Sequence, residues 1–387
     1  MTRLSTGLML ALALLLALPS SVGAARQCAG PGINYQPEAY SAADRLSVIA
    51  YNTYLLPISA RDIPFMGDKF AVAQEERAAL IAPFLSPFDV AILSEVYDDD
   101  ARRVLLEGLR AEGFLYSTHI LASAYRDQDS DSTNRVHAQD PPIRACAKGE
   151  SCGFGAAGEG DSFVDQDGGV IIVAKYPITE AKELVYGDCD GRDCHAAKGF
   201  VYAAIEKFGR RYHVIGTHAQ FGWNSEQSAA KRKQFGQIRE FATRSSGIPQ
   251  SEPIIVGGDF NMLRREFAEL EDDSLLGAIA PNFLGHRYTR EMRNDWVRRG
   301  NGYVDYVFAL RGFRAPAYSS NCPLVFRTRF DFEDGTLFSS VSGEDLCDLS
   351  DHFSVWGYFD FSDTPTDAPS DALAASAPHC PLPELSE

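Results

Sequence analysis

Residues 253–261 read PIIVGGDFN, a short apolar run that leads through two glycines to an aspartate and an asparagine. The branched residues before the glycines predict a buried strand. The two glycines allow a sharp backbone turn and leave room for a ligand. Asp259 and Asn261 are two residues apart, so extended backbone can aim both at one pocket. The stretch predicts a strand ending at a functional site, although an ordinary Asx turn would use the same residues.

Other apolar runs, rich in Val, Ile, Tyr and Phe, predict further buried strands at 46–51, 90–93, 169–173, 200–205, 212–217, 303–308 and 353–359. Helical patterns lie between some of them, at 72–85, 99–112 and 225–244. Interspersed strands and helices predict a layered α/β or α+β domain.

Polar residues that can carry chemistry recur at the ends of these runs: Asn52, Glu95, His218, Asp259, Asn261, Asp305, Asp351 and His352. One such residue is usually part of a turn, but the repetition indicates a shared site. A carboxylate such as Glu95 between apolar neighbours must be paired or bind a cation, and a core ion pair with an arginine is the alternative. Histidine suits proton transfer near neutral pH, although a single buried histidine is commonly structural.

The composition is that of a globular protein: 387 residues, 45% hydrophobic and 23% charged, which excludes a disordered or fibrous chain. The formal net charge of −17 repels phosphate backbones, so we expect no nucleic-acid partner. The chain lacks the G-x-S-x-G, Walker and H-E-x-x-H motifs. Their absence argues against a serine hydrolase, a P-loop nucleotidase and a zincin.

Residues 1–24 read as a signal peptide, with Arg3 before an apolar run and a small-residue cleavage site at Ala24. A membrane anchor is the alternative, but the run of about 11 residues is shorter than the roughly 20 that span a bilayer. We therefore expect a secreted protein, extracellular or periplasmic. We expect residues 25–43 to form an N-terminal segment, 44–361 the main domain and 362–387 an extended tail rich in Pro, Ala, Ser and Asp.

The eight cysteines are compatible with disulfides in an exported protein. Nearest-neighbour spacing suggests the pairs Cys146–Cys152, Cys189–Cys194, Cys322–Cys347 and Cys28–Cys380, out of about 105 connectivities. A zinc site is disfavoured, because no C-x-x-C pair occurs. The polar segment 126–167 is unusually long for a loop, and we read it as a disulfide-pinned insertion or a functional loop.

In this order along the chain, the polar residues resemble the catalytic set of the endonuclease/exonuclease/phosphatase superfamily, over roughly residues 44–361. That resemblance implies the DNase I-like fold, a four-layer sandwich of two packed β-sheets flanked by helices. Four segments are most similar to bacterial-type sphingomyelinases C: YNTYLL at 51–56, EVYD at 95–98, KGFVY at 198–202 and THAQ at 217–220. The third of them is typical of sphingomyelinases rather than nucleases.

The resemblance implies hydrolysis of sphingomyelin, or of a related choline phospholipid in membranes, to phosphocholine and ceramide. It makes Glu95 the main metal ligand, with Asn52 nearby, and Mg²⁺ the cofactor, with Mn²⁺ or Co²⁺ as alternatives. Asp259 would position the attacking water, while Asn261 and His218 would hold phosphoryl oxygens. His352 would be the general acid/base, oriented by Asp305 and supported by Asp351.

The chain also departs from the family. No cysteine follows Gln220 closely enough for the family's longer disulfide, and Cys189–Cys194 would replace it. The segment 322–347, where relatives carry an exposed aromatic hairpin, holds phenylalanines but no tryptophan, and would either contact a membrane or lie in the core. The alternatives to a sphingomyelinase are a nuclease or phosphatase on the same scaffold, or a non-catalytic toxin-like binding module.

Overall fold

The structure is a computed structural model that describes residues 42–56, 73–122, 166–328, 330 and 346–362. The predicted signal peptide, most of the segments 25–43 and 126–167, and nearly all of the tail lie outside these residues. The same holds for the predicted pairs Cys146–Cys152 and Cys28–Cys380. Those expectations therefore stay predictions.

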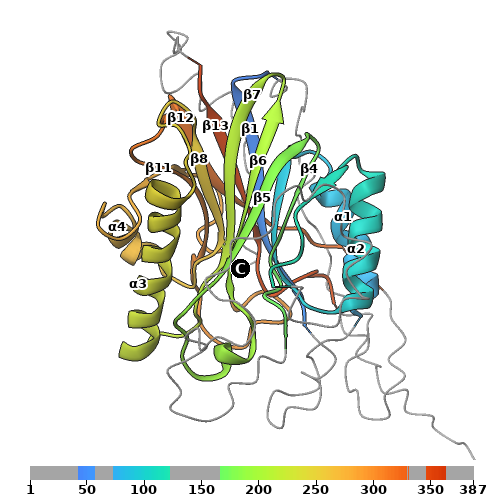
Figure 1. Ribbon diagram of the computed structural model, residues 1–387. Coiled ribbons are helices and arrows are strands. Elements are labelled where there is room, and N and C mark those ends of the chain that lie inside the picture. Colours follow the sequence, from blue (N-terminus) through green and yellow to red (C-terminus); the bar gives the residue numbers. More distant parts are fainter. Residues whose placement is uncertain (1–41, 57–72, 123–165, 329, 331–345, 363–387) are drawn as a thin grey trace, which may run out of the picture.

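Thirteen described strands form two mixed sheets (Figure 1). The seven-stranded sheet has the order β10 (Asn282–Phe283), β12 (Tyr318–Leu324), β13 (Ser354–Asp360), β1 (Arg45–Leu55), β2 (Val90–Val96), β4 (Ile171–Ala174) and β3 (Tyr116–Ser117). The six-stranded sheet has the order β5 (Ile178–Val185), β6 (Gly199–Lys207), β7 (Arg210–His218), β8 (Ile254–Asp259), β11 (Asp305–Leu310) and β9 (Ala278–Ile279).

Helices cover the outer face of each sheet (Figure 1). The first pair, α1 (Gln74–Leu85) and α2 (Asp99–Ala111), packs against the seven-stranded sheet. The second pair, α3 (Ser225–Glu240) and the short α4 (Phe267–Leu270), lies on the six-stranded sheet. This arrangement confirms the predicted four-layer sandwich. No helix in the described ranges is both long enough and apolar enough to span a membrane.

The apolar residues divide into three buried layers. Alternate residues of β1 face opposite ways, so that Val48 packs between the sheets while Ile49 packs toward α1 and α2. The third layer joins the six-stranded sheet to α3, through residues such as Phe200 and Phe235. Central strands are therefore buried on both faces, which is why they read as continuous apolar runs.

Several boundaries differ from the prediction. Strands β1 and β2 run four and three residues past the predicted ends, so Asn52 and Glu95 lie inside strands. The third predicted helix ends at Glu240 and continues as one π-helical turn, Phe241–Ser245. Neither β5 nor β12 was predicted, because their sequences, ITEAKELV and YSSNCPL, are too polar to read as apolar runs.

Cys189 and Cys194 form the predicted disulfide. It closes a short loop that includes most of the 3₁₀ turn Gly191–His195. Cys322 and Cys347 are also disulfide-bonded, and their predicted pairing with each other stays a prediction.

Candidate active site

Strand register assembles one half of the site on the six-stranded sheet. Strands β7 and β8 are parallel and place His218 beside Asp259. Strand β11 is antiparallel to β8 and places Asp305 on the other side of Asp259. All three side chains are buried. These three residues span 87 positions of the chain, from 218 to 305, and the strand pairing makes them neighbours at one sheet edge.

The seven-stranded sheet supplies the other half. The parallel strands β1 and β2 pair Asn52 with Ser94, which directly precedes Glu95. Arg77 of α1 secures this edge by donating to the backbone oxygens of Tyr54, at 2.8 Å, and Leu349, at 2.9 Å. The bond to Leu349 ties the segment that carries Asp351 and His352 to the end of β1.

Asp259 lies at the centre of the group. Its Oδ2 accepts a hydrogen bond from Asn52 Nδ2 at 3.2 Å and lies 3.6 Å from His218 Nε2 and 4.0 Å from His352 Nε2. Its Oδ1 accepts the backbone N–H of Asn261 at 2.8 Å. Burial, followed by the Asp305 carboxylate, raises the pKa of Asp259 to about 6. The carboxylate is thus held firmly and is more basic than an exposed aspartate.

His352 and Asp305 form a hydrogen-bonded pair. The ring Nδ1 of His352 donates to Asp305 Oδ2 at 2.8 Å. Burial lowers the pKa of His352, but the carboxylates of Asp305, Asp351 and Asp259 outweigh burial and raise it to about 10. The ring is therefore protonated at neutral pH, with Nε2 directed toward Asp259.

Glu95 is a buried carboxylate with one oxygen unpaired. Among the described residues, Oε2 has no hydrogen-bond partner. Burial, followed by Asp351, raises the pKa of Glu95 to about 7, while a hydrogen bond from Asn52 opposes that rise. The backbone at Glu95 has φ of 55°, and Tyr54 and Asn261 also have positive φ, at 54° and 49°. Such left-handed conformations cost energy and cluster at functional sites.

Lys198 is a buried cation at this site that the sequence analysis quoted within KGFVY but did not name as a site residue. Its Nζ donates to Asp193 Oδ2 at 2.7 Å and to the backbone oxygen of Ala219 at 3.1 Å, and lies 3.1 Å from His218 Nε2. An ammonium has only donors, so Nε2 accepts and the ring proton is on Nδ1. Burial and Lys198 hold the pKa of His218 well below its usual value, so this ring is neutral.

Asp351 and Asn261 complete the predicted set. Asp351 Oδ2 lies 3.6 Å from Arg290 Nε, while Oδ1 has no partner among the described residues. Asn261 Nδ2 donates to the Ala219 backbone oxygen at 3.1 Å, which leaves one amide hydrogen for a ligand. All eight predicted residues therefore lie at one edge of the sandwich.

The donor set fits a hard divalent cation. The unpaired Oε2 of Glu95 and the unpaired Oδ1 atoms of Asp305 and Asp351 are oxygen ligands of the kind that Mg²⁺ prefers. Asp259, Asp305 and His352 form a second arrangement, with one ligand atom each within 4.8 Å of the others. There, however, the neighbouring carboxylates keep His352 protonated, and a protonated ring cannot bind a cation. Of the two places, the one at Glu95, with Asn52 beside it, is therefore better suited to bind a cation.

The chain matches the model of the Endonuclease/Exonuclease/phosphatase family over residues 66–352. It is 30% identical to a sphingomyelinase C of Bacillus cereus over 297 residues, which are 72% of this chain and 79% of the relative. It is 26% identical to sphingomyelinase C 2 of Leptospira interrogans over 328 residues, covering 81% of this chain and 46% of the relative. The chain thus spans about half the length of the Leptospira relatives.

Solved structures agree with these matches. The structure of a beta toxin variant of Staphylococcus aureus with bound magnesium ions superimposes with a TM-score of 0.64 at 26% identity. The superposition covers 81% of this chain and 99% of that protein.

Proposed function

Because the chain belongs to the endonuclease/exonuclease/phosphatase family, we propose that it is a secreted, Mg²⁺-dependent phosphodiesterase that hydrolyses sphingomyelin to ceramide and phosphocholine. The central observation is the buried row of His218, Asp259 and Asp305, with His352 bonded to Asp305 and Glu95 opposite. The names of its relatives, sphingomyelinases C, point to the substrate.

The residues divide the work of the reaction. Asp259, held by Asn52 and the Asn261 amide, orients the attacking water and accepts its proton as the water oxygen bonds to phosphorus. His352, kept protonated by its carboxylates, gives the Nε2 proton to the ceramide oxygen as the bond from that oxygen to phosphorus breaks. Asp305 fixes the ring so that Nε2 faces the substrate.

Hydrogen-bond donors that are already in place stabilise the negative charge on the phosphoryl oxygens. Asn261 has one amide hydrogen left for a phosphoryl oxygen, and His218 lies at the same edge, with its Nε2 3.6 Å from Asp259 Oδ2. Fixed donors of this kind stabilise a transition state without reorganisation at the moment of reaction. Glu95, with Asn52, would hold Mg²⁺, which supplies Lewis-acid stabilisation of the phosphoryl charge when bound.

The described surface beside the site has an aromatic pair suited to a lipid interface. Phe221 and Trp223 are 49% and 48% exposed, and their ring centroids are 5.1 Å apart. The Phe221 amide donates to Asp193 Oδ2, which also binds Lys198. In the predicted membrane-contact segment 322–347, Phe326 and Phe330 are buried in the core, while residues 331–345 lie outside the described residues. Aromatic side chains favour the interfacial zone of a bilayer.

Secretion is supported by the Cys189–Cys194 disulfide, because such bonds persist mainly in oxidising compartments.

The test is phosphocholine release from sphingomyelin and phosphatidylcholine liposomes, with Mg²⁺ or with EDTA. We expect Mg²⁺-dependent release from sphingomyelin, and a His352→Ala variant should lose on the order of 10²–10⁴ in rate. Near-normal release by that variant would contradict the assigned chemistry. Failure to release phosphocholine from either lipid, together with hydrolysis of a nucleic acid or a phosphomonoester, would favour a nuclease or phosphatase.

A further inference from the structure

A cavity of about 490 Å³ adjoins the catalytic edge. It is lined by the segment that follows Asn261, by the turn that precedes Asp305, and by the segment that carries Arg287: Leu263, Arg264, Arg265, Arg287, Tyr288, Asn301, Gly302 and Tyr303. Gly302 and Arg290 exchange backbone hydrogen bonds, and Arg290 lies 3.6 Å from Asp351. The cavity is therefore joined to the active site through both β8 and the Arg290 segment. Its volume is in the range of roughly 300–1,000 Å³ typical of ligand sites.

Three arginines of this cavity have their charge available. In the described part of the chain, Arg264, Arg265 and Arg287 take part in no ion pair. Arg264 lies 4.2 Å above the Phe283 ring and 5.8 Å from that of Tyr303, and Arg287 lies 5.7 Å from the Tyr288 ring. Stacking occupies the face of a guanidinium and leaves its edge N–H groups free. The rings thus hold two exposed guanidinium groups in place, and their N–H groups have no partner among the described residues.

The segment that carries Arg287 is basic, although the whole protein is acidic. The chain has a formal net charge of −17, yet residues 284–303 contain five arginines (287, 290, 293, 298 and 299) against the two acids Glu291 and Asp295. Arg290 and Arg293 are paired with carboxylates, whereas the three cavity arginines are not. Glu266 is the carboxylate next to this cavity, and it accepts the Leu263 amide without pairing with an arginine. Guanidinium groups that are free of carboxylate partners attract anions, and they match the geometry of phosphate oxygens.

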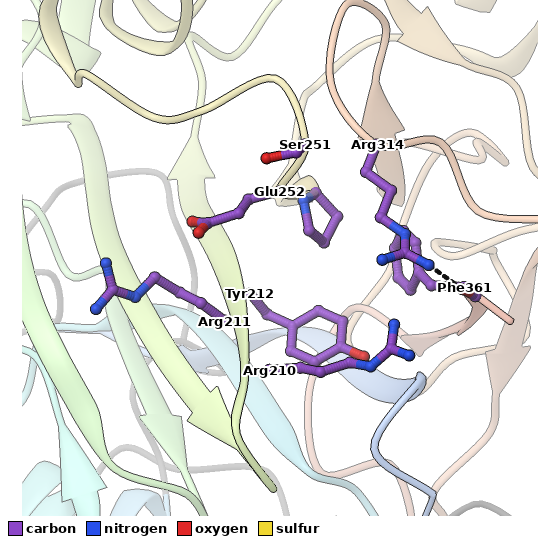
Figure 2. A pocket seen from close by; sticks show the side chains of 8 residues that line it. Arg210, Arg211, Tyr212, Ser251, Glu252, Arg314 and Phe361 are labelled. Carbon is purple, nitrogen blue, oxygen red and sulfur yellow. Dashed lines mark hydrogen bonds between the residues drawn. The ribbon is translucent and has the colours of Figure 1, made fainter. Parts of the chain in front are cut away.

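A second arginine-lined cavity provides a contrast at the opposite end of β7 and β8 (Figure 2). It is smaller, about 140 Å³, and Glu252 lies among its arginines. There Arg314 donates to the backbone oxygen of Phe361, and Glu252 accepts from His213. That cavity has part of its positive charge balanced by its own carboxylate, and it is remote from the catalytic edge.

We propose that the cavity of Arg264, Arg265 and Arg287 binds a phosphate-bearing anion, presented to the enzyme as the headgroup of an anionic phospholipid that lies beside the substrate. The anion site rests on the cavity and its arginines alone. The lipid source rests on the proposed function, because only an enzyme that works at a bilayer meets such headgroups there.

The test measures binding without catalysis. The full chain is mixed, in EDTA, with phosphatidylcholine vesicles that contain or lack phosphatidylglycerol, and the bound fraction is measured by sedimentation. We expect tighter binding to the anionic vesicles. Arg264→Gln/Arg265→Gln/Arg287→Gln should lose that gain, by about fivefold per arginine. The control, Arg210→Gln/Arg211→Gln, removes two arginines from the cavity of Figure 2 and should keep the tighter binding to anionic vesicles.

Further measurements distinguish a lipid headgroup from other phosphate-bearing ligands. Stabilisation of the wild type by inorganic phosphate, absent in the triple variant, with no gain from phosphatidylglycerol would keep the anion site and overturn the lipid source. Tighter binding of a single-stranded oligonucleotide than of vesicles would also overturn the lipid source. Equal loss in the control would overturn the site itself. Should the triple variant melt early, the single Arg287→Gln variant serves instead. Because sphingomyelin and Mg²⁺ are absent, these outcomes do not depend on phosphocholine release.

Discussion

The two ends of the sandwich treat buried charge in opposite ways. At the end remote from the site, the Lys207 ammonium is fully buried and donates to Asp89 Oδ2 at 2.7 Å and to the Arg45 backbone oxygen at 2.9 Å. Asp89 also accepts the Ser47 amide. At the catalytic end, oxygens of Glu95, Asp305 and Asp351 have no partner among the described residues. The remote end uses charge to hold the sheets together, whereas the catalytic end keeps charge available for a ligand.

Of the substitutions considered, Glu95→Gln should have the largest effect on activity. Activity on sphingomyelin liposomes should fall more than about 100-fold, since changes even to residues behind metal ligands cost up to that much. The free energy of unfolding in EDTA should not fall, because a neutral amide replaces a buried charge that lacks a full set of partners. Activity assays and urea titration check both parts. A large loss of stability with retained activity would show instead that Glu95 stabilises the fold and is not needed for the reaction.

Lys207→Met tests the opposite end. The change leaves the Asp89 carboxylate without its cation, and removing one partner of a buried pair costs about 3–5 kcal/mol. Urea titration should show that loss, while activity per folded molecule stays near wild type because the site lies at the other end of the strands. Selective loss of activity would contradict the division between the two ends.

Replacing Cys189 and Cys194 by serine should have a smaller effect. Opening so short a loop is expected to cost about 2 kcal/mol of stability. The loop contains Asp193, which binds Lys198 beside His218, so activity should also decline. Denaturant titration of the double variant beside the oxidised wild type measures the loss. Identical stability of the two proteins would show that the loop is held by other contacts.

The smallest effect concerns pH. The pKa of Glu95 is raised to about 7, so below pH 7 a cation must displace a proton from this carboxyl group. Mg²⁺ affinity should therefore fall by about tenfold per pH unit below 7 and level off above it. Calorimetry at pH 6, 7 and 8 measures this, and Glu95→Gln serves as the pH-independent control. A Mg²⁺ affinity that does not change between pH 6 and pH 8 would show that Glu95 is not the metal ligand.

The buried strands were predictable because burial on both faces leaves an uninterrupted apolar run, and the clustering of the candidate site residues was predictable because they follow the ends of these runs. Strand β12 was missed because its buried Asn321 is satisfied by the backbone of Val307 in the other sheet, a contact that no local pattern reveals. Lys198 was not assigned a role because its importance depends on Asp193 and His218, which a sequence does not bring together. The family resemblance was correct, since motif order survives where overall identity is low.

The first and the last described strands are neighbours in the middle of one sheet. Residues 45–50 of β1 pair with β13, which is separated from His352 by one residue. A nascent chain that has not yet been synthesised as far as Asp360 lacks one of the two strands that pair with β1, the one that follows His352, the proposed proton donor. Catalytic competence should therefore appear in one step, once β13 has been synthesised. A ribosome-stalled chain that stops before residue 354 should be inert, although it already contains every residue named in the site.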